Sequence, residues 1–231
     1  MQVTIYGSRL SPFVEKVIRG VQRKSLTYEL IEPKSPTDLE KWNPQTGKMP
    51  VVDLDGERLF DSTFILRKLD ERVPHPPLVS EDPVVAAHQR QIEDWADEAL
   101  YWYGIAFHWT PKNAGATAGR MLGSMRVPGF LQPLLAPMVR RRIGGQLRAQ
   151  GIGRLPEPLL AREFGEKLDD LLRMLGERSF FYSDQPSVAD LAVYGQLRAA
   201  DDELSPETRD AIRRRPKLVE YMKRVEQATG G

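Results

Sequence analysis

Two serines lie where helices are expected to begin, and this position suits the binding of an anion. Ser11 stands directly before Pro12, a residue favoured at the first helical position, and Ser62 follows Asp61 after a strand-like run. The N–H groups at a helix N-terminus and the positive end of the helix dipole stabilise a negative charge. Both serines also have a purely structural explanation as helix caps. The sequence therefore leaves a chemical and a structural role open for each.

The rest of the residue inventory excludes several kinds of chemistry. The chain has no Cys, so it has no disulfide, no thiolate metal site and no cysteine nucleophile, and any thiol must come from outside. His75, His88 and His108 lack the spacing that is typical of metal ligands, so we predict no metal site. Tyr6 and Ser8 are further hydroxyl side chains near Ser11, and both have structural explanations, as a strand aromatic and a turn residue.

Charge and hydropathy give no sign of a nucleic-acid partner or a membrane span. The 231 residues carry 33 Lys and Arg against 32 Asp and Glu, a net charge of +1. The first residues are typical of a strand and not of a signal peptide, and the weakly polar stretch 128–139 is too short to span a bilayer. We therefore expect a cytoplasmic protein. The basic clusters 140–142 and 213–215 are either solvated helix faces or contacts for an anionic substrate or lipid.

The first part of the chain predicts a small α/β domain. An apolar run at 3–5 suits a buried strand, and a stripe of valine and isoleucine at helical spacing follows Pro12. A strand near 26–31, a short helix within 33–42, a hairpin around Asp55-Gly56 and a helix opened by Asp61 and Ser62 complete the order βαβαββα. This is a thioredoxin-like order, assigned to residues 1–75. Pro50 precedes the third strand either as an ordinary strand-start proline or in a cis bond with Met49.

The remainder predicts an all-helical domain. Clustered prolines make residues 76–83 the linker, and residues 84–231 show helical apolar spacing without a strand pattern. Ser187 and Asp190 form a capping box at the start of one helix. The Gly-rich segment 112–130 has helix propensity too low for any element to be predicted, and we expect a mobile insert there.

Several of these segments together resemble the glutathione transferase family. Residues 6–13, 43–51 and 61–63 carry the resemblance in the first domain, and residues 93–97 and 186–190 carry it in the second. The resemblance implies a thioredoxin-like domain joined to a helical one, and a homodimer. Residues 140–154 also resemble the metaxin and failed-axon-connections group, whose members have no established catalysis.

The resemblance implies attack by the glutathione thiolate on a small apolar electrophile. The hydroxyl of Ser11 is then the group that stabilises the thiolate, because its hydrogen bond and the helix N-terminus both favour the anion. Serine at this family position favours conjugation over the thiol exchange that cysteine would support. Tyr6 is the second candidate for the hydroxyl.

The same resemblance assigns glutathione, as co-substrate, to three segments. Lys48 is a candidate for the glycyl carboxylate, and the backbone of Val51, following Met49 and Pro50, pairs with the cysteinyl unit. Asp61 and Ser62 hold the γ-glutamyl end at a helix N-terminus. Family members usually carry Glu or Gln before this serine, and Asp61 is one methylene shorter.

Two other functions remain open at this stage. A glutathione-dependent isomerase or dehalogenase would use the same thiolate in a differently shaped pocket. A non-catalytic interaction protein would keep the fold without the chemistry, and it would be indifferent to replacement of Ser11.

Overall fold

The computed structural model describes residues 1–35 and 37–230. Its first part is a four-stranded sheet with the strand order β2-β1-β3-β4, in which β1 and β2 are parallel and the other neighbours are antiparallel. The elements follow the predicted order βαβαββα. They are β1 (Val3–Tyr6), α1 (Pro12–Arg23), β2 (Glu29–Ile31), α2 (Asp38–Trp42), β3 (Val51–Leu54), β4 (Glu57–Phe60) and α3 (Ser62–Arg72).

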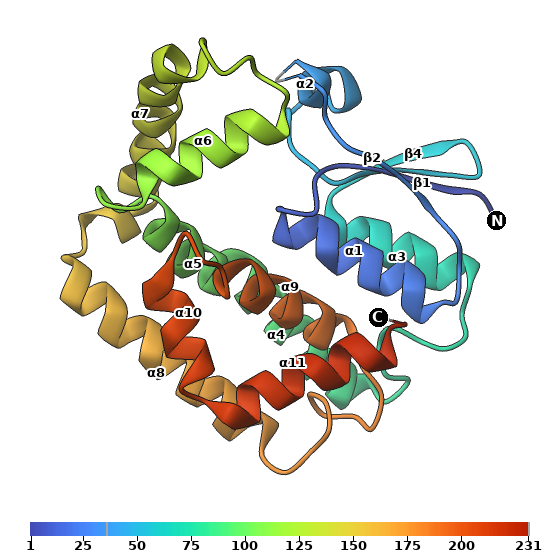
Figure 1. The fold of residues 1–231 in the computed structure, drawn as a ribbon. Helices are drawn as coiled ribbons and strands as arrows, with labels where there is room; N and C mark the ends of the chain where they lie inside the picture. The colour runs from blue at the N-terminus through green and yellow to red at the C-terminus, as the bar shows by residue number, and fades with distance from the viewer. Residues whose placement is uncertain (36, 231) are drawn as a thin grey trace.

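The helices α1 and α3 lie side by side on one face of the sheet (Figure 1). The valine and isoleucine stripe of α1 is fully buried against β1 and β3, which explains why this short helix is stable in place. The hairpin between β3 and β4 turns at Asp55 and Gly56, both with positive φ, as the Asp-Gly pair predicts.

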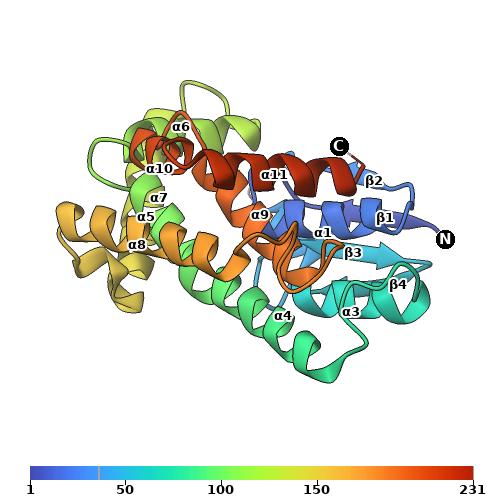
Figure 2. The same ribbon diagram turned by 90° about the horizontal axis from the view of Figure 1, so that it is seen from below.

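The second part is helical, and α9 runs through its centre (Figures 1 and 2). Its elements are α4 (Pro83–Trp95), the π-helical turn η1 (Ala96–Leu100), α5 (Tyr101–His108), α6 (Ala114–Ser124), α7 (Gln132–Gln150), the 3-10 turn η2 (Ile152–Arg154), α8 (Glu157–Leu175), α9 (Val188–Ala200), α10 (Pro206–Arg213) and α11 (Pro216–Ala228). The predicted fold class, a small α/β unit followed by a helical bundle, is thereby confirmed.

The start of α9 is fixed by a buried carboxylate. Asp190 accepts hydrogen bonds from the backbone N–H of Ser187 at 2.9 Å and from its hydroxyl at 3.0 Å, and the capping box predicted for this pair is present. The backbone N–H of Phe181 and the hydroxyl of Tyr221 donate to its other oxygen, each at 3.0 Å. Burial nevertheless raises the pKa of Asp190 to about 6.

Helices α1 and α9 pack closely enough to join the two parts. A Cβ added to Gly195 of α9 would lie 2.5 Å from the carbonyl oxygen of Pro12, so only glycine allows this approach. Val188 and Leu191 of α9 lie in the same core cluster as the first part, together with Leu78 from the Pro-rich connection.

The Gly-rich segment differs from the expectation of a mobile insert without a regular element. It forms the helix α6, in which Ala114, Ala118 and Leu122 recur at a spacing of four and are buried. The side chain of Asn113 donates to the carbonyl of Phe107 at 2.9 Å, and the hydroxyl of Thr117 donates to that of His108 at 2.8 Å. Tertiary burial and these two bonds offset the low helix propensity of the glycines.

Among the helices of residues 1–35 and 37–230, none combines the length and the apolar character needed to cross a bilayer.

Candidate functional site

The sheet register gathers three of the predicted site segments at one end of the strands, where β1 and β4 finish and β3 begins. This end is called the sheet edge below. Tyr6 at the end of β1 pairs with Val51 at the start of β3, and Val51 pairs with Phe60 at the end of β4. Since β1 and β4 run in the same direction, α1 and α3 both begin at this edge. The turn that contains Ser11, the Met49-Pro50-Val51 segment and the Asp61-Ser62 segment therefore meet at the same end of the sheet.

Ser11 is the N-cap of α1 and also lines a cavity. Its backbone is extended, with φ −86° and ψ 125°, and its Oγ lies 3.5 Å from the backbone nitrogen of Val14, at the long limit of a hydrogen bond. The oxygen accepts in this capping bond, so the hydroxyl proton stays free to donate to a ligand in the cavity. The structural and the chemical roles of Ser11 are compatible.

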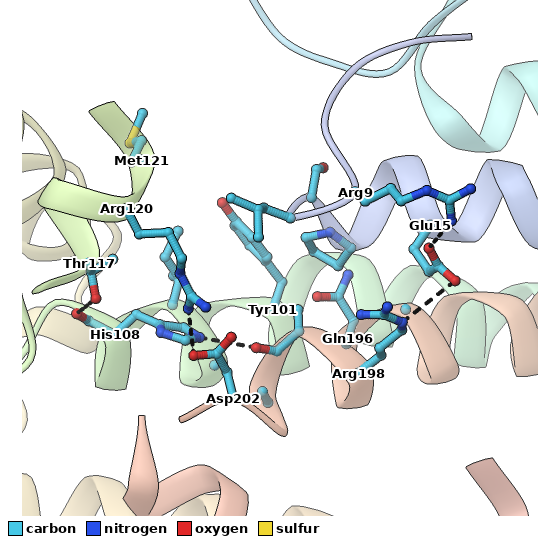
Figure 3. A pocket seen from close by; sticks show the side chains of 18 of the residues that line it. Arg9, Glu15, Tyr101, His108, Thr117, Arg120, Met121, Gln196, Arg198 and Asp202 are labelled. Carbon is cyan, nitrogen blue, oxygen red and sulfur yellow. Dashed lines mark hydrogen bonds and ion pairs between the residues drawn. The ribbon is translucent and has the colours of Figure 1, made fainter. Parts of the chain in front are cut away.

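The cavity has a volume of about 220 Å³ and lies between the turn after β1 and the helices α5, α6 and α9. Figure 3 shows the charged side chains at its two ends, with Tyr101 and Gln196 between them, and Leu10, Pro12 and Ile105 add apolar wall. Four elements or their connections line the cavity. The lining includes Arg9, Leu10, Ser11, Pro12 and Glu15 at the start of α1; Tyr101, Ile105, His108 and Trp109 of α5 and its end; Thr117, Arg120 and Met121 of α6; and Gln196, Arg198, Ala199 and Asp202 of α9 and its end.

A buried carboxylate lies one turn along α1 from Ser11. Glu15 is 1% exposed and accepts from the Nε of Arg19 at 2.8 Å, and the Nε of Arg198 lies 3.7 Å from the same oxygen. Its other oxygen has no hydrogen-bond partner, and the nearest cation, Arg9, is 3.9 Å away. Arg19 also pairs with Glu226 at 3.3 Å, so three arginines face two carboxylates, and the remaining positive charge near Ser11 favours an anionic ligand there.

The opposite end of the cavity is formed by His108, Arg120 and Asp202. Arg120 and Asp202 form an ion pair, and the Nε2 of His108 lies 3.0 Å from the carbonyl oxygen of Ala199, so this nitrogen carries the proton and donates. Burial lowers the pKa of His108, and its buried Nδ1 has no partner. A neutral imidazole with a free acceptor nitrogen therefore lies at this end.

Aromatic residues divide between the cavity and the core. Tyr101 and Trp109 line the cavity, and Trp109 also packs against the helical core, whereas Trp102, Tyr103 and Phe107 belong to or pack against that core without lining the cavity. Burial raises the pKa of Tyr101 to about 12, so its phenol stays protonated at neutral pH and is a hydrogen-bond donor.

The residues predicted to bind the thiol peptide lie at the sheet edge, outside the lining of the cavity. The Met49–Pro50 bond is cis, and the Sδ of Met49 lies 3.2 Å from the backbone nitrogen of Ser8, which ties this segment to the turn that bears Ser11. Val51 is buried, and Lys48 is exposed on a loop held by Asn43, whose amide donates to the Lys48 carbonyl at 3.2 Å.

At the N-terminus of α3, Asp61 is the N-cap and Ser62 is the first helical residue. The Asp61 carboxylate accepts from the backbone nitrogens of Thr63 at 3.0 Å and Phe64 at 3.3 Å, and its backbone has φ +68°. Ser62 is buried, with 5% exposed. Asp61 therefore already occupies part of the anion site that the resemblance assigns to the γ-glutamyl carboxylate.

Tyr6 lies away from the cavity. Its hydroxyl donates to the Oδ2 of Asp53 at 2.9 Å, and the guanidinium of Arg58 stacks on its ring at 5.0 Å. Partial burial and the bond to Asp53 raise the pKa of Tyr6. The structure thus does not bring Tyr6 together with Ser11 in the cavity.

Several cavity residues were not singled out by the sequence. Glu15, Arg120, Gln196, Arg198 and Asp202 come from α1, α6 and α9 with its C-terminal end, and no local spacing links the three elements. Thr117 and Met121 lie in the segment for which no helix was predicted. Only the helix pattern of 114–122 could have indicated that these two share a face.

Within the part of the chain that the structure describes, no group of three or more His, Asp and Glu side chains is arranged to hold a metal ion.

Comparison with known proteins gives two family matches. The family model for the glutathione S-transferase N-terminal domain matches residues 5–77, and that for the C-terminal domain matches residues 164–225. Together they cover more than half of the chain.

Relatives along the whole chain include an isoprene-epoxide–glutathione S-transferase of Rhodococcus sp. (strain AD45), 27% identical over 96% of this chain and 97% of the relative. The Drosophila melanogaster protein Failed axon connections is 25% identical over 94% of this chain, which spans 53% of that relative's length. A maleylacetoacetate isomerase of Pseudomonas aeruginosa is 28% identical over 80% of this chain and 72% of the relative.

A solved glutathione S-transferase of Methylobacterium radiotolerans, in complex with glutathione sulfonate, superposes with a TM-score of 0.67 at 21% identity, over 98% of this chain and 91% of the other. At that identity the likeness concerns the fold, and it agrees with the α/β and helical parts described above. The two domain matches in their family order, the relatives along the whole chain and this shared fold have one explanation: the chain belongs to the glutathione S-transferase family of enzymes.

Proposed function

We propose that this protein binds reduced glutathione at the edge of the sheet and transfers its thiolate to a small, mostly apolar electrophile in the adjoining cavity. The observation that carries the proposal is the placement of Ser11, which caps α1 and lines the cavity at the same time.

Ser11 lowers the pKa of the bound thiol in this proposal. Its hydroxyl donates a hydrogen bond to the sulfur, and the N-terminus of α1 adds positive potential. The proton lost by the thiol passes to solvent, and the thiolate is the nucleophile. Because Arg9, Arg19 and Arg198 surround Glu15, the carboxylate one turn away does not cancel this field.

Glutathione lies across the sheet edge with three contacts. The backbone of Val51 pairs with the cysteinyl unit, Ser62 and the N-terminus of α3 hold the γ-glutamyl carboxylate, and Lys48 reaches the glycyl carboxylate. The support for this placement is the register that aligns Tyr6, Val51 and Phe60, because it brings the three segments to one edge. The homodimer and the two domain ranges expected from the sequence stay predictions.

The electrophile is a compound with an apolar body and an oxygen that takes up charge, such as an epoxide. The sulfur bonds to the ring carbon, the carbon–oxygen bond breaks, and the new alkoxide takes a proton from Tyr101 or water. The apolar walls and the protonated phenol of Tyr101 favour this class. The name of the Rhodococcus relative, an isoprene-epoxide–glutathione S-transferase, points the same way.

The test is an ultraviolet titration of the glutathione thiolate with and without saturating protein. We expect the bound thiol pKa to fall by at least about one unit, and Ser11→Ala to restore it. Ser8→Ala is the matched control, because Ser8 lies in the same turn and its hydroxyl accepts only from the backbone nitrogen of Leu10, at 3.3 Å. Binding without any pKa shift would favour the non-catalytic interaction protein, and equal effects of both variants would remove Ser11 from the mechanism.

A further inference from the structure

One face of α7 exposes apolar side chains to solvent. Leu134 is 70% exposed and Met138 66%, and the two lie four residues apart in α7; Phe130, in the turn just before the helix, is 82% exposed. Residues four apart lie on the same side of a helix. A side chain of this size gains free energy when water is removed from it, so three exposed in a row mark a contact surface.

The same face continues into a row of arginines. Arg141, Arg142 and Arg148 lie three, four and ten residues after Met138, which returns them to the side of the helix that bears Leu134 and Met138. All three are exposed, whereas Leu147, on the opposite side, is buried. We call Phe130, Leu134, Met138 and these three arginines the α7 face.

Charge is distributed very unevenly around this face. Residues 99–156 contain eight Lys and Arg and no Asp or Glu, in a chain whose net charge is only +1. Lys112 and Arg120 form ion pairs with acidic residues outside the segment. The other six, which include the arginines of the α7 face, make no ion pair among the residues that the structure describes. They are Arg126, Arg140, Arg141, Arg142, Arg148 and Arg154.

The α7 face is also accessible in the fold. Helix α7 packs mainly against α6 and η2, and Figure 1 shows it at the side of the molecule opposite the N-terminus. The cavity lies on the other side of α6, which contributes Thr117, Arg120 and Met121 to it. Binding at the α7 face would therefore leave the cavity unobstructed.

We propose that the α7 face docks on an anionic lipid bilayer. The arginines lie against the phosphate and carboxylate headgroups, and Phe130, Leu134 and Met138 enter the boundary between headgroups and acyl chains. Unpaired cations beside exposed apolar side chains are the combination that such a surface recognises. The protein lies on the membrane in this proposal and does not cross it.

A bilayer fits this face better than a nucleic acid or a second copy of the chain. The phosphate backbone of a duplex would pair with the arginines but would leave the three apolar side chains in water. A second copy would bring two positively charged faces together, because both sides of a two-fold interface are the same surface, and like charges oppose that contact. Of these three occupants, the lipid surface is the one that satisfies both halves of the face.

The first experiment is co-sedimentation of the full chain with vesicles at low salt. Vesicles of phosphatidylcholine with about 30% phosphatidylserine should bind the protein, and vesicles of phosphatidylcholine alone should not. The triple variant Arg141→Gln, Arg142→Gln, Arg148→Gln should lower the affinity by about fivefold per arginine, on the order of a hundredfold in all. The matched control is Arg67→Gln, Arg90→Gln, Arg214→Gln, which removes the same charge from exposed arginines elsewhere and should bind nearly as the parent does.

A second experiment measures whether the apolar half of the face enters the lipid. The chain has no Cys, so Met138→Cys gives one labelling site for an environment-sensitive fluorophore. Its emission should rise on anionic vesicles, while a label at Glu177→Cys, an exposed residue elsewhere, should not respond.

Several results would overturn the proposal. These are no binding to anionic vesicles, equal losses in the two triple variants, no response from the label at 138, or competition by a roughly 30-base-pair duplex that removes the protein from vesicles. A change of oligomeric state in light scattering that only the α7-face triple variant abolishes would identify the face as an interface between copies of the chain.

Discussion

Asp61 is the residue at which this chain departs from the glutathione-binding pattern that its family resemblance implies. Its carboxylate caps α3 through the backbone nitrogens of Thr63 and Phe64 while its backbone has φ +68°. A positive φ is uncommon for a residue with a side chain and is concentrated at functional positions. The carboxylate also places a negative charge beside the site proposed for the γ-glutamyl carboxylate, and two like charges at one helix end repel each other.

Asp61→Asn should therefore tighten glutathione binding by about fivefold, because asparagine caps as well as aspartate but carries no charge. Isothermal titration with reduced glutathione measures the change. Asp82→Asn is the control, since Asp82 caps α4 in the same manner, accepting from Val84 and Val85, but lies outside the site. Weaker binding in Asp61→Asn would mean that the carboxylate contacts the ligand's ammonium group instead.

Among the site residues, the sequence could predict only those that lie in a recognisable local pattern, such as a helix cap. Ser11 and Ser62 precede or open helices, and their positions follow from capping and proline rules. His108, Arg120 and Asp202 meet only because α5, α6 and the end of α9 converge in space. No spacing within one element encodes such a meeting, so the far end of the cavity could not be predicted.

Among the elements, the contact between α1 and α9 sets the position of Ser11. Gly195 lets the backbone of α9 approach the carbonyl of Pro12, the residue next to Ser11. Any side chain at position 195 must push α1 away from α9, because the atom it meets belongs to the backbone and cannot rotate aside.

Gly195→Ala should therefore destabilise the fold by about 2 kcal/mol and lower kcat/KM by roughly tenfold or more, through displacement of Ser11. Urea unfolding and conjugation kinetics measure the two effects. Gly144→Ala in α7 is the matched control: a Cβ there meets no atom within 4 Å, so the variant should keep its activity and gain up to about 1 kcal/mol. An active and equally stable Gly195→Ala would show that α9 does not position α1.

Helix α6 is an element that helix propensity alone does not predict. Its glycines lower the local propensity, and the helix forms because its alanine and leucine side is buried and Asn113 and Thr117 bond to the end of α5. Helix propensity counts only the residues of the helix itself, so it does not include this burial or these two bonds to the end of α5. In contrast, the hairpin at Asp55-Gly56 and the capping box at Ser187 depend on neighbours in sequence and were predicted.

On the scale of the whole molecule, a buried charge cluster joins the α/β part to the helical part. The Nζ of Lys16 in α1 contacts Glu93 of α4 at 2.7 Å, Asp97 of η1 at 2.5 Å and the hydroxyl of Thr63 at 3.0 Å. Lys16 is 1% exposed. Burial raises the pKa of Asp97, and Lys16 opposes that shift. Without the lysine, two carboxylates would face each other inside the protein.

Lys16→Met should destabilise the protein by about 3–5 kcal/mol at pH 7, because it leaves uncompensated buried charge. The loss should shrink at lower pH. In the variant, Asp97 keeps a raised pKa in the folded state only, so the folded state binds more protons than the unfolded one, and stability falls as pH rises through that pKa. Urea unfolding at several pH values measures both effects.

Lys112→Met is the comparison for that experiment. Lys112 and Glu157 are exposed and Glu207 is half-buried, so solvent screens these ion pairs and little change is expected at any pH. A Lys16→Met protein as stable as the parent at pH 7 would mean that the cluster does not hold the two parts together.

Helix α6 has one side on the cavity and the other on α7. If docking of α7 on a surface shifts α6, the wall formed by Thr117, Arg120 and Met121 shifts with it, and an occupant of the cavity that moves this wall acts on α7 through the same helix. Thermodynamic linkage then requires reciprocity: the factor by which a docked α7 changes the affinity of the cavity for its ligand equals the factor by which that ligand changes the affinity of α7 for its surface. Because α6 is a wall of both, one coupling free energy would then set how membrane docking changes ligand binding and how ligand binding changes membrane docking.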